Sequence, residues 1–196
     1  MESKLQASNL DYILAKPLQL LIVFYLVLLP YVAIAEEPKE ASMLSSIQET
    51  VSQTWQSTDY ELYIPVNVWH NRHYYSDEKI DGFNENPWGL GLGKYRFDNE
   101  GDWHGLYAMA FFDSHRKIEP AVGYGFQKIW HSSENTRLGL GYTVAVTARK
   151  EYHYIPTPII LPLVSVQYKG VAVQSTYVPG GNGYGNILFT WLRWQL

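Results

Sequence analysis

The chain has 196 residues, 15% of them aromatic and none of them cysteine, and a formal net charge of −4 at pH 7. The negative charge argues against a nucleic-acid partner, which requires a basic surface, and a disulfide-stapled fold is excluded. Sixteen tyrosines and seven tryptophans suit the two aromatic girdles of a membrane barrel, although a soluble all-β domain can be similarly rich in them.

The N-terminus has the features of a secretory signal peptide. Two lysines precede an apolar run at 18–32, and residues 33–35, Ala-Ile-Ala, have the small-x-small form that signal peptidase cleaves. A retained anchor is the alternative, but the run is shorter than the roughly 20 residues of a membrane span and contains Pro30. We expect cleavage after Ala35, which leaves residues 36–196 as one outer-membrane domain.

Residues 40–55 have the pattern of an amphipathic helix. Leu44, Ile47, Val51 and Trp55 lie three or four positions apart, with polar residues between them. We expect a helix over about 40–56 that lies on the membrane surface. A helix packed on a soluble core would show the same pattern.

From residue 60 onward the hydrophobic period changes to two. In the segment 138–147, bulky residues alternate with Gly, Thr and Ala, and we expect the bulky face to contact lipid. The first segment likewise places Leu62, Ile64, Val66 and Val68 on one outer face. Eight such segments lie at about 60–70, 87–97, 103–113, 120–130, 137–149, 159–168, 171–179 and 186–196. They predict an all-β fold, an eight-stranded antiparallel transmembrane β-barrel preceded by a short amphipathic α-helix.

The connections alternate in length. Short turns are expected at 98–102, 131–136 and 169–170, and longer or more irregular loops at 71–86, 114–119, 150–157 and 180–185. In outer-membrane barrels the short turns face the periplasm and the longer loops face outward. The first strand ends at His70 and the third at Asp113, both on the loop side, so we expect these residues to meet at one rim.

Seven glycines lie on the strand faces opposite the bulky residues: Gly89, Gly91, Gly93, Gly123, Gly125, Gly139 and Gly141. If they face the lumen, they leave space that an eight-stranded barrel normally fills with side chains. Because these positions carry no charge, the lumen could accept a hydrocarbon chain. Glycines also ease the curvature of a small barrel, which is a competing explanation.

Prolines cluster at two places in the predicted wall. One pair is Pro65 and Pro87, in the first and second strands, and the other group is Pro156, Pro158, Pro162 and Pro179, at the loop-side ends of the sixth and seventh strands. Each proline removes a ladder N–H, so the wall could part there and admit a lipid. Prolines also commonly end strands, and that alternative stays open.

The loop-side rim carries His70, Asp113 and Ser114. A histidine can act as a base near neutral pH and activate a hydroxyl, although Asp-Ser is also a common start of a loop. Adjacent strand residues point to opposite faces, so Asp113 and Ser114 can serve one site only if the strand has already bent. The other histidines show no metal-ligand spacing.

Six segments resemble, in the same order, those of the lipid A palmitoyltransferase family, the PagP-type outer-membrane enzymes. They are LYIPVNVWH (62–70), NENPWGLGLG (84–93), DWHGLYAMAFFDS (102–114), EPAVGYG (119–125), LGLGYTVAVTAR (138–149) and GYGNILFTWLRWQL (183–196). The resemblance implies transfer of a palmitoyl chain from a glycerophospholipid to lipid A of lipopolysaccharide, without a cofactor or metal. It further implies a Gram-negative outer-membrane protein, a monomer or weak homodimer, whose active site faces the outer leaflet and whose product protects against cationic antimicrobial peptides.

The same resemblance assigns site residues. The family's histidine falls on His70 and its Asp-Ser pair on Asp113 and Ser114, while its glycine at the floor of the acyl pocket falls on Gly125. Its lateral openings fall on Pro65 and Pro87 on one side, and on Pro156, Pro158 and Pro179 on the other. We expect His70 to act as base and then acid, Ser114 as nucleophile or proton relay, and Asp113 to orient or polarise the pair.

Two other functions use the same features. A non-catalytic small barrel that binds lipid or serves in adhesion would need the apolar lumen without the chemistry. A phospholipase would use the same rim residues with water as the acyl acceptor. Phe126 follows Gly125 where the family often has Trp, which leaves the preferred chain length open.

Overall fold

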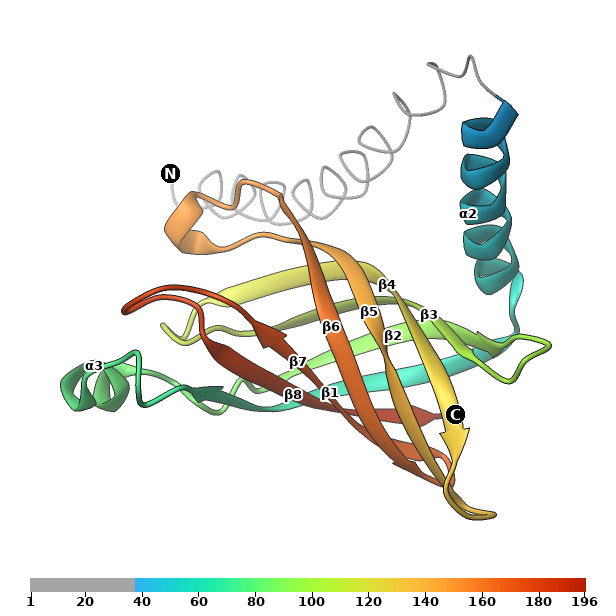
Figure 1. The fold of residues 1–196 in the computed structure, drawn as a ribbon. Helices are drawn as coiled ribbons and strands as arrows, with labels where there is room; N and C mark the ends of the chain where they lie inside the picture. Colours follow the sequence, from blue (N-terminus) through green and yellow to red (C-terminus); the bar gives the residue numbers. More distant parts are fainter. Residues whose placement is uncertain (1–37) are drawn as a thin grey trace, which may run out of the picture. The chain divides into compact units, whose positions relative to one another are not determined.

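A computed structural model describes residues 38–196 (Figure 1). The chain divides into two units at residue 50, and the second, Val51–Leu196, contains the whole barrel. The predicted signal peptide, residues 1–35, lies outside the described residues, so cleavage after Ala35 stays a prediction. Within residues 38–196, no helix combines the length and hydrophobicity needed to cross a membrane.

The first described element is helix α2, Pro38–Gln56, which confirms the predicted helix. Its last turn is tied to the barrel by Lys94, whose Nζ donates a hydrogen bond to the Trp55 carbonyl at 2.8 Å and lies 5.6 Å from the centre of the Trp55 ring. The Trp55 side chain still leaves 67% of its surface exposed. Placement of the helix on a membrane surface stays a prediction.

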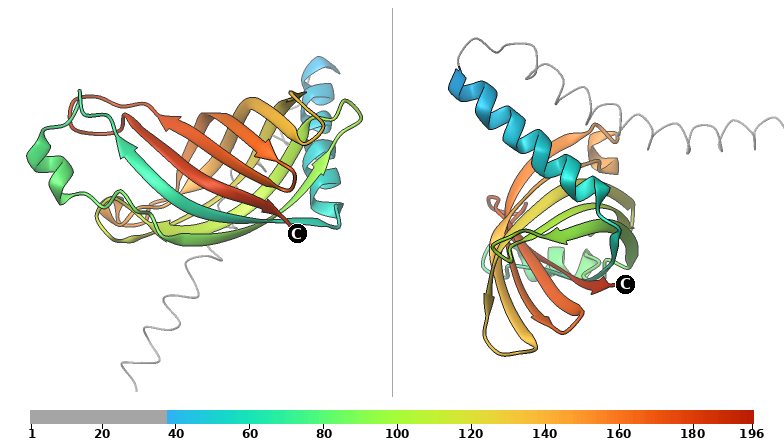
Figure 2. Two further views of the ribbon diagram at one scale, coloured as in Figure 1. Left: turned by 90° about the horizontal axis from the view of Figure 1, so that it is seen from below. Right: turned by 90° about the vertical axis from the view of Figure 1, so that its right-hand side faces the viewer.

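Eight antiparallel strands close into a barrel, in which each strand pairs with its neighbours in sequence and β8 pairs with β1. The strands are β1 (Asp59–His70), β2 (Gly89–Phe97), β3 (Trp103–Phe112), β4 (Ile118–His131), β5 (Thr136–Thr147), β6 (Thr157–Tyr168), β7 (Val171–Val178) and β8 (Ile187–Gln195). Figure 2 shows the strands tilted around a common axis. The predicted fold and all eight strand positions are confirmed.

The three predicted short turns lie at one end of the barrel and the other connections at the opposite end, as Figure 1 shows. Three of those other connections are longer, but the β3–β4 loop has the same length as the β2–β3 turn. The longer loops contain two short helices, α3 (Asp77–Gly82) and η1 (Lys150–Tyr152). We call the second end the loop-side rim, and it is where β1 and β3 both finish.

A bulge in β1 turns His70 into the lumen. The pairing of β1 with β8 shifts between Pro65 and Asn67, so Val66 is an extra residue and the strand changes faces there. Val68 is consequently buried, with 4% of its surface exposed, and its predicted position on the outer face is wrong. Because a one-residue shift inverts every later side chain, His70 would face lipid without the bulge. Proline has no backbone N–H to donate to a neighbouring strand, so Pro65 suits a position where the regular pairing is interrupted.

The lumen is polar toward the short turns. Glu61 and Arg193 are buried there at 0% and 1% exposure, with the Arg193 Nε 3.7 Å from the Glu61 carboxylate. The Arg193 guanidinium also lies 4.0 Å from the centre of the Trp103 ring. The uncharged lumen inferred from the glycine-bearing faces is therefore wrong for this half, and Glu119 and Arg149 also line the lumen nearer the rim. The sequence pattern missed the Glu61–Arg193 pair because its two charges come from β1 and β8, at opposite ends of the barrel sequence.

The buried pair gives a stability prediction. Arg193→Met leaves the Glu61 carboxylate in the lumen without its cation, and we expect a loss of about 3–5 kcal/mol in the free energy of unfolding. Urea unfolding of the refolded barrel in lipid vesicles measures it. The double variant Glu61→Gln with Arg193→Met should recover part of this loss, because it removes the uncompensated charge; equal losses in the two variants would contradict the assignment.

Candidate active site

An apolar cavity of about 230 Å³ occupies the half of the lumen nearer the loop-side rim. Along β3 it is lined in turn by Phe111, Met109 and Tyr107, and the turn after β3 brings Ser114 to the same cavity. At the deeper end, the Tyr107 hydroxyl lies 2.7 Å from the Thr143 hydroxyl. The cavity is therefore a tube with apolar walls, a polar mouth and a pair of hydroxyl groups near its inner end.

Gly125 lies beyond this deeper end and does not line the cavity itself. A Cβ at Gly125 would lie 2.8 Å from Cζ3 of Trp103 and 3.3 Å from Cδ1 of Leu163. Trp103 is fully buried, so its indole fills the space next to Gly125. The role of Gly125 as the pocket floor stays a prediction, and Trp103 is the group through which a side chain at 125 would act.

His70 and Ser114 are hydrogen bonded at the mouth of the cavity. The His70 Nε2 lies 2.9 Å from the Ser114 Oγ, and both side chains are buried. Strand β3 ends at Phe112, and the Asp113 N–H donates to the Lys117 carbonyl at 2.7 Å. The chain thus turns between Phe112 and Ser114, which is the bend that a shared site requires.

Asp113 holds together the turn that presents Ser114. Its Oδ1 accepts hydrogen bonds from the backbone N–H groups of His115 and Lys117, each at 2.8 Å. Its Oδ2 is buried without a hydrogen-bond partner in the described part of the chain. Asp113 also lines the cavity, next to Ser114. No hydrogen bond among the described residues joins its carboxylate to His70.

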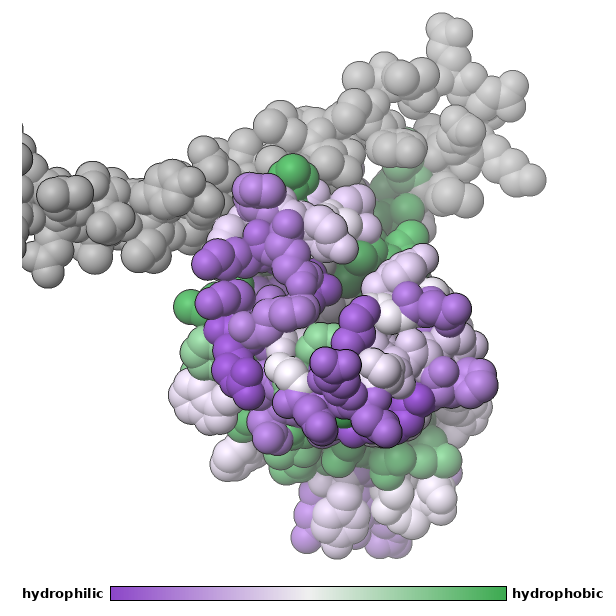
Figure 3. Space-filling view, turned by 90° about the vertical axis from the view of Figure 1, so that its left-hand side faces the viewer, coloured by the Kyte–Doolittle hydropathy of each residue, from purple (hydrophilic) through white to green (hydrophobic). Residues whose placement is uncertain are grey.

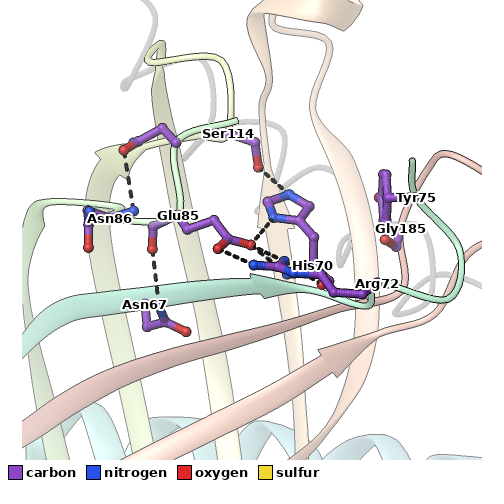
Figure 4. Close-up of polar contacts among 9 residues, drawn as sticks. Asn67, His70, Arg72, Tyr75, Glu85, Asn86, Ser114 and Gly185 are labelled. Carbon is purple, nitrogen blue, oxygen red and sulfur yellow. Dashed lines mark hydrogen bonds and ion pairs between the residues drawn. The ribbon is translucent and has the colours of Figure 1, made fainter. Parts of the chain in front are cut away.

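Glu85, which is not among the site residues predicted from the sequence, occupies the other side of His70. Its Oε1 lies 3.0 Å from the His70 Nδ1 and accepts a second hydrogen bond from the His70 backbone N–H at 3.0 Å (Figure 4). Arg72 donates to both carboxylate oxygens, at 2.6 and 2.7 Å, and to the His70 carbonyl at 2.7 Å. These hydrogen bonds from Arg72 lower the pKa of Glu85 to about 2, so the carboxylate is ionised at neutral pH.

Two aromatic rings of the β1–β2 loop enclose the His70 imidazole. Phe83 stacks on it, with ring centres 4.5 Å apart, and Tyr75 meets its edge at 5.3 Å. The same loop is joined to the β3–β4 loop because the Asn84 N–H donates to the Ser114 carbonyl at 2.8 Å. The loop therefore fixes both partners of the His70–Ser114 hydrogen bond. Figure 3, which faces this end of the barrel, shows hydrophilic residues gathered over the loops.

Ladder pairing ends early at both predicted openings. Strands β1 and β2 pair only as far as Tyr63 and Gly91, although β1 continues to His70. Strands β6 and β7 pair only as far as Leu163 and Thr176, which leaves residues 157–162 without a β7 partner. The prolines at these interrupted segments are Pro65 and Pro87 at the first, and Pro158, Pro162 and Pro179 at the second, with Pro156 in the loop before β6. Whether lipids pass there stays a prediction.

The described residues contain no group of three or more histidine, aspartate or glutamate side chains that could hold a metal ion. The profile of the family described as "Antimicrobial peptide resistance and lipid A acylation protein PagP" matches residues 50–193, which include the whole site. The chain belongs to the PagP family.

Individual members of the PagP family are closely similar to this chain. The lipid A acyltransferase PagP of Laribacter hongkongensis is 60% identical over 148 residues, which cover 76% of this chain and 72% of that protein. The lipid A palmitoyltransferase PagP of Escherichia coli O6:K15:H31 is 45% identical over 177 residues, covering 88% and 95%. Among solved structures, the Yersinia pestis outer membrane protein Ail aligns at 8% identity with a TM-score of 0.40, covering 70% of this chain and 99% of that one.

The Arg72–Glu85 contact gives a pH prediction for this member of the PagP family. Because the pKa of Glu85 lies at about 2 in the folded protein and near 4.5 without its partners, its contribution to stability is complete above pH 4.5 and is lost as the pH falls toward 2. Carbon-13 NMR of the Glu85 carboxyl should give a midpoint near 2. Arg72→Gln should move that midpoint toward 4.5, and a wild-type midpoint already near 4.5 would contradict the prediction.

Proposed function

We propose that this chain is an outer-membrane acyltransferase that moves a palmitoyl chain from a glycerophospholipid to lipid A. The observation that carries the proposal is the 2.9 Å hydrogen bond between His70 and Ser114 at the mouth of an apolar cavity within a β-barrel. The family's description and the names of its members supply the acceptor class. The glycerophospholipid donor and the palmitoyl chain come from the resemblance seen in the sequence.

The hydrogen bond supports two routes for the acyl group. In the first, the Ser114 Oγ attacks the donor ester carbon while its proton passes to the His70 Nε2; the bond to the glycerol oxygen breaks, and His70 returns the proton to that oxygen. A lipid A hydroxyl then attacks the acyl-serine and loses its proton to His70; the bond to the Ser114 oxygen breaks, and His70 returns the proton to that oxygen. In the second, the lipid A hydroxyl attacks the donor ester carbon directly while Ser114 relays its proton to His70; the bond to the glycerol oxygen breaks, His70 protonates that oxygen, and Ser114 is never acylated. Both routes use His70 first as base and then as acid.

Asp113 contributes to the proposed reaction in a different way. By accepting two backbone N–H groups it fixes the turn that points Ser114 at His70. Asp113 lines the cavity, and its Oδ2 is buried without a partner among the described residues, although a buried acceptor without a donor is energetically unfavourable. We assign to it a hydrogen bond from a substrate hydroxyl, which polarises that hydroxyl beside the His70–Ser114 pair.

The acyl chain occupies the apolar cavity, with its ester at the rim and its methyl end toward Trp103 and Gly125. Chain length is then measured by depth, because a longer chain meets the Trp103 indole and the polar half of the lumen. Lipids enter through the wall where β1–β2 and β6–β7 pairing is interrupted, at Pro65 and Pro87 and at Pro156, Pro158 and Pro179. The loop-side rim faces the outer leaflet, where lipid A is found.

The outcome of the reaction separates this proposal from two others. Lipid A from cells with and without the protein is compared by mass spectrometry, and the proposal requires an added palmitoyl mass that depends on the protein. A non-catalytic lipid-binding or adhesive barrel adds none. A phospholipase releases free fatty acid in place of acylated lipid A.

The paired rim residues give a prediction of activity. Ser114→Ala and His70→Ala should each abolish palmitoyl transfer, because either change removes the proton path, while the barrel retains its heat-resistant migration in detergent gels. The control is Ser175→Ala, a strand hydroxyl in β7 outside the cavity lining, which should keep full transfer. Full transfer by either rim variant would remove that residue from the mechanism.

Gly125, the proposed floor of the cavity, gives a prediction of chain-length selectivity. Gly125→Met forces the Trp103 indole or the new side chain toward the cavity, so the preferred donor chain should become shorter by several carbons. Donor phospholipids of graded chain length measure the preference. The matched control is Ala108→Met, the same side chain on an exposed position of β3, which should leave it unchanged. An unaltered preference in Gly125→Met would sink the floor assignment.

A further inference from the structure

The inference concerns the Nδ1 side of His70, and it rests on the proposed function of the His70–Ser114 pair. Both ring nitrogens are engaged, Nε2 by the Ser114 hydroxyl at 2.9 Å and Nδ1 by Glu85 at 3.0 Å. To accept the serine proton, Nε2 must be unprotonated in the neutral ring, so the ring proton must be on Nδ1. An ionised carboxylate can only accept hydrogen bonds, so a carboxylate at Nδ1 selects this tautomer.

Glu85 is fixed on His70 by more than the ring contact. The same Oε1 accepts the His70 backbone N–H, and Arg72 bridges the Glu85 carboxylate and the His70 carbonyl. The bidentate Arg72 contact holds the carboxylate plane, which a single hydrogen bond would leave free to rotate. The Glu85 carboxylate therefore fixes both the side chain and the backbone of His70.

The neighbouring acid is not placed for this task. The two hydrogen bonds of the Asp113 carboxylate are donated to its Oδ1 by backbone N–H groups of its own turn, those of His115 and Lys117. When His70 takes the serine proton, it becomes a cation in a position only 2% exposed, where water cannot stabilise it. Glu85 is the carboxylate in hydrogen-bond contact with that cation.

We propose that Glu85 is the positioning residue of the reaction, holding His70 in the Nδ1–H tautomer and stabilising the imidazolium, with Arg72 holding Glu85. Ser114, His70 and Glu85 then form a Ser–His–acid relay in which the acid comes from the β1–β2 loop. Asp113 has a separate role: it stabilises the turn that carries Ser114 and accepts the hydrogen bond proposed from a substrate hydroxyl. Figure 4 shows Glu85 and Ser114 on opposite sides of the His70 ring.

Kinetics of purified variants test the proposal. Glu85→Gln should lower kcat for palmitoyl transfer by roughly 10²- to 10⁴-fold with little change in KM, because the amide can also donate to the ring and stabilise the wrong tautomer. Glu85→Asp keeps the charge and should recover at least part of this loss. The control is Glu78→Gln, an exposed acid of α3 in the same loop, which should keep wild-type rates.

The pH profile distinguishes positioning from a merely structural role. A neighbouring carboxylate favours the protonated imidazole, so in Glu85→Gln the acid limb of kcat/KM should move to lower pH by roughly one unit. A loop that had only lost structure would lower the rate without moving this limb. A wild-type rate and an unmoved limb in Glu85→Gln would overturn the proposal.

Nitrogen-15 NMR of histidine-labelled wild-type protein in detergent tests the tautomer without any substrate, with His70→Ala identifying the signal. Neutral His70 should show a protonated Nδ1 and an unprotonated Nε2, and the reverse would overturn the proposal even if Glu85→Gln fails to fold. Because this measurement needs no turnover, an inactive wild-type protein would contradict the proposed function while leaving the tautomer result to decide the role of Glu85.

Discussion

Closure of the backbone hydrogen-bond ladder is the constraint on which the rest of this structure depends. A strand in hydrocarbon has no water to satisfy its N–H and C=O groups, so every strand must find a partner on each side and the sheet must close. Closure of eight strands imposes the alternation of lumen and lipid faces on every residue from β1 to β8. Only where the regular pairing is interrupted can a side chain leave this alternation and join a functional site.

Two local departures from the regular ladder serve the site. The extra residue at Val66 inverts the end of β1, so that His70 enters the lumen. The turn after Phe112 releases Ser114 from strand alternation, so that it can meet His70 from the facing loop. Both occur near the rim, where loops replace lost ladder bonds: the Val68 N–H, for example, donates to the Glu85 carbonyl. The loop residue that accepts the unpaired N–H of β1, Glu85, is thus also the partner of the His70 ring.

The lumen divides into parts with different physical roles. Near the rim, the side chains that line the lumen are mostly apolar and leave a cavity, with polar groups such as Asp113 and Ser114 at its mouth. Toward the short turns, Glu61, Arg193 and their neighbours fill the barrel with hydrogen bonds and a cation–π contact. Trp103 lies at the boundary, with Gly125 on one side of its ring and Arg193 over its face. A barrel of this size can therefore hold a hydrocarbon chain in one half and stabilise itself with the other.

The sequence by itself determined the strands, the helix, the alternation of turns and loops, and the rim positions of His70 and Ser114, because these depend on neighbours along the chain. The two-residue hydrophobic period of a strand and the residues of its turns can be recognised locally, without knowing which distant residues will pack against them. Only the tertiary structure decided the bulge at Val66, the Glu61–Arg193 pair, the indole beside Gly125 and the contact of Glu85 with His70. Each depends on register across the closed barrel or on the path of an irregular loop, and a one-residue difference in either reverses which side chains meet.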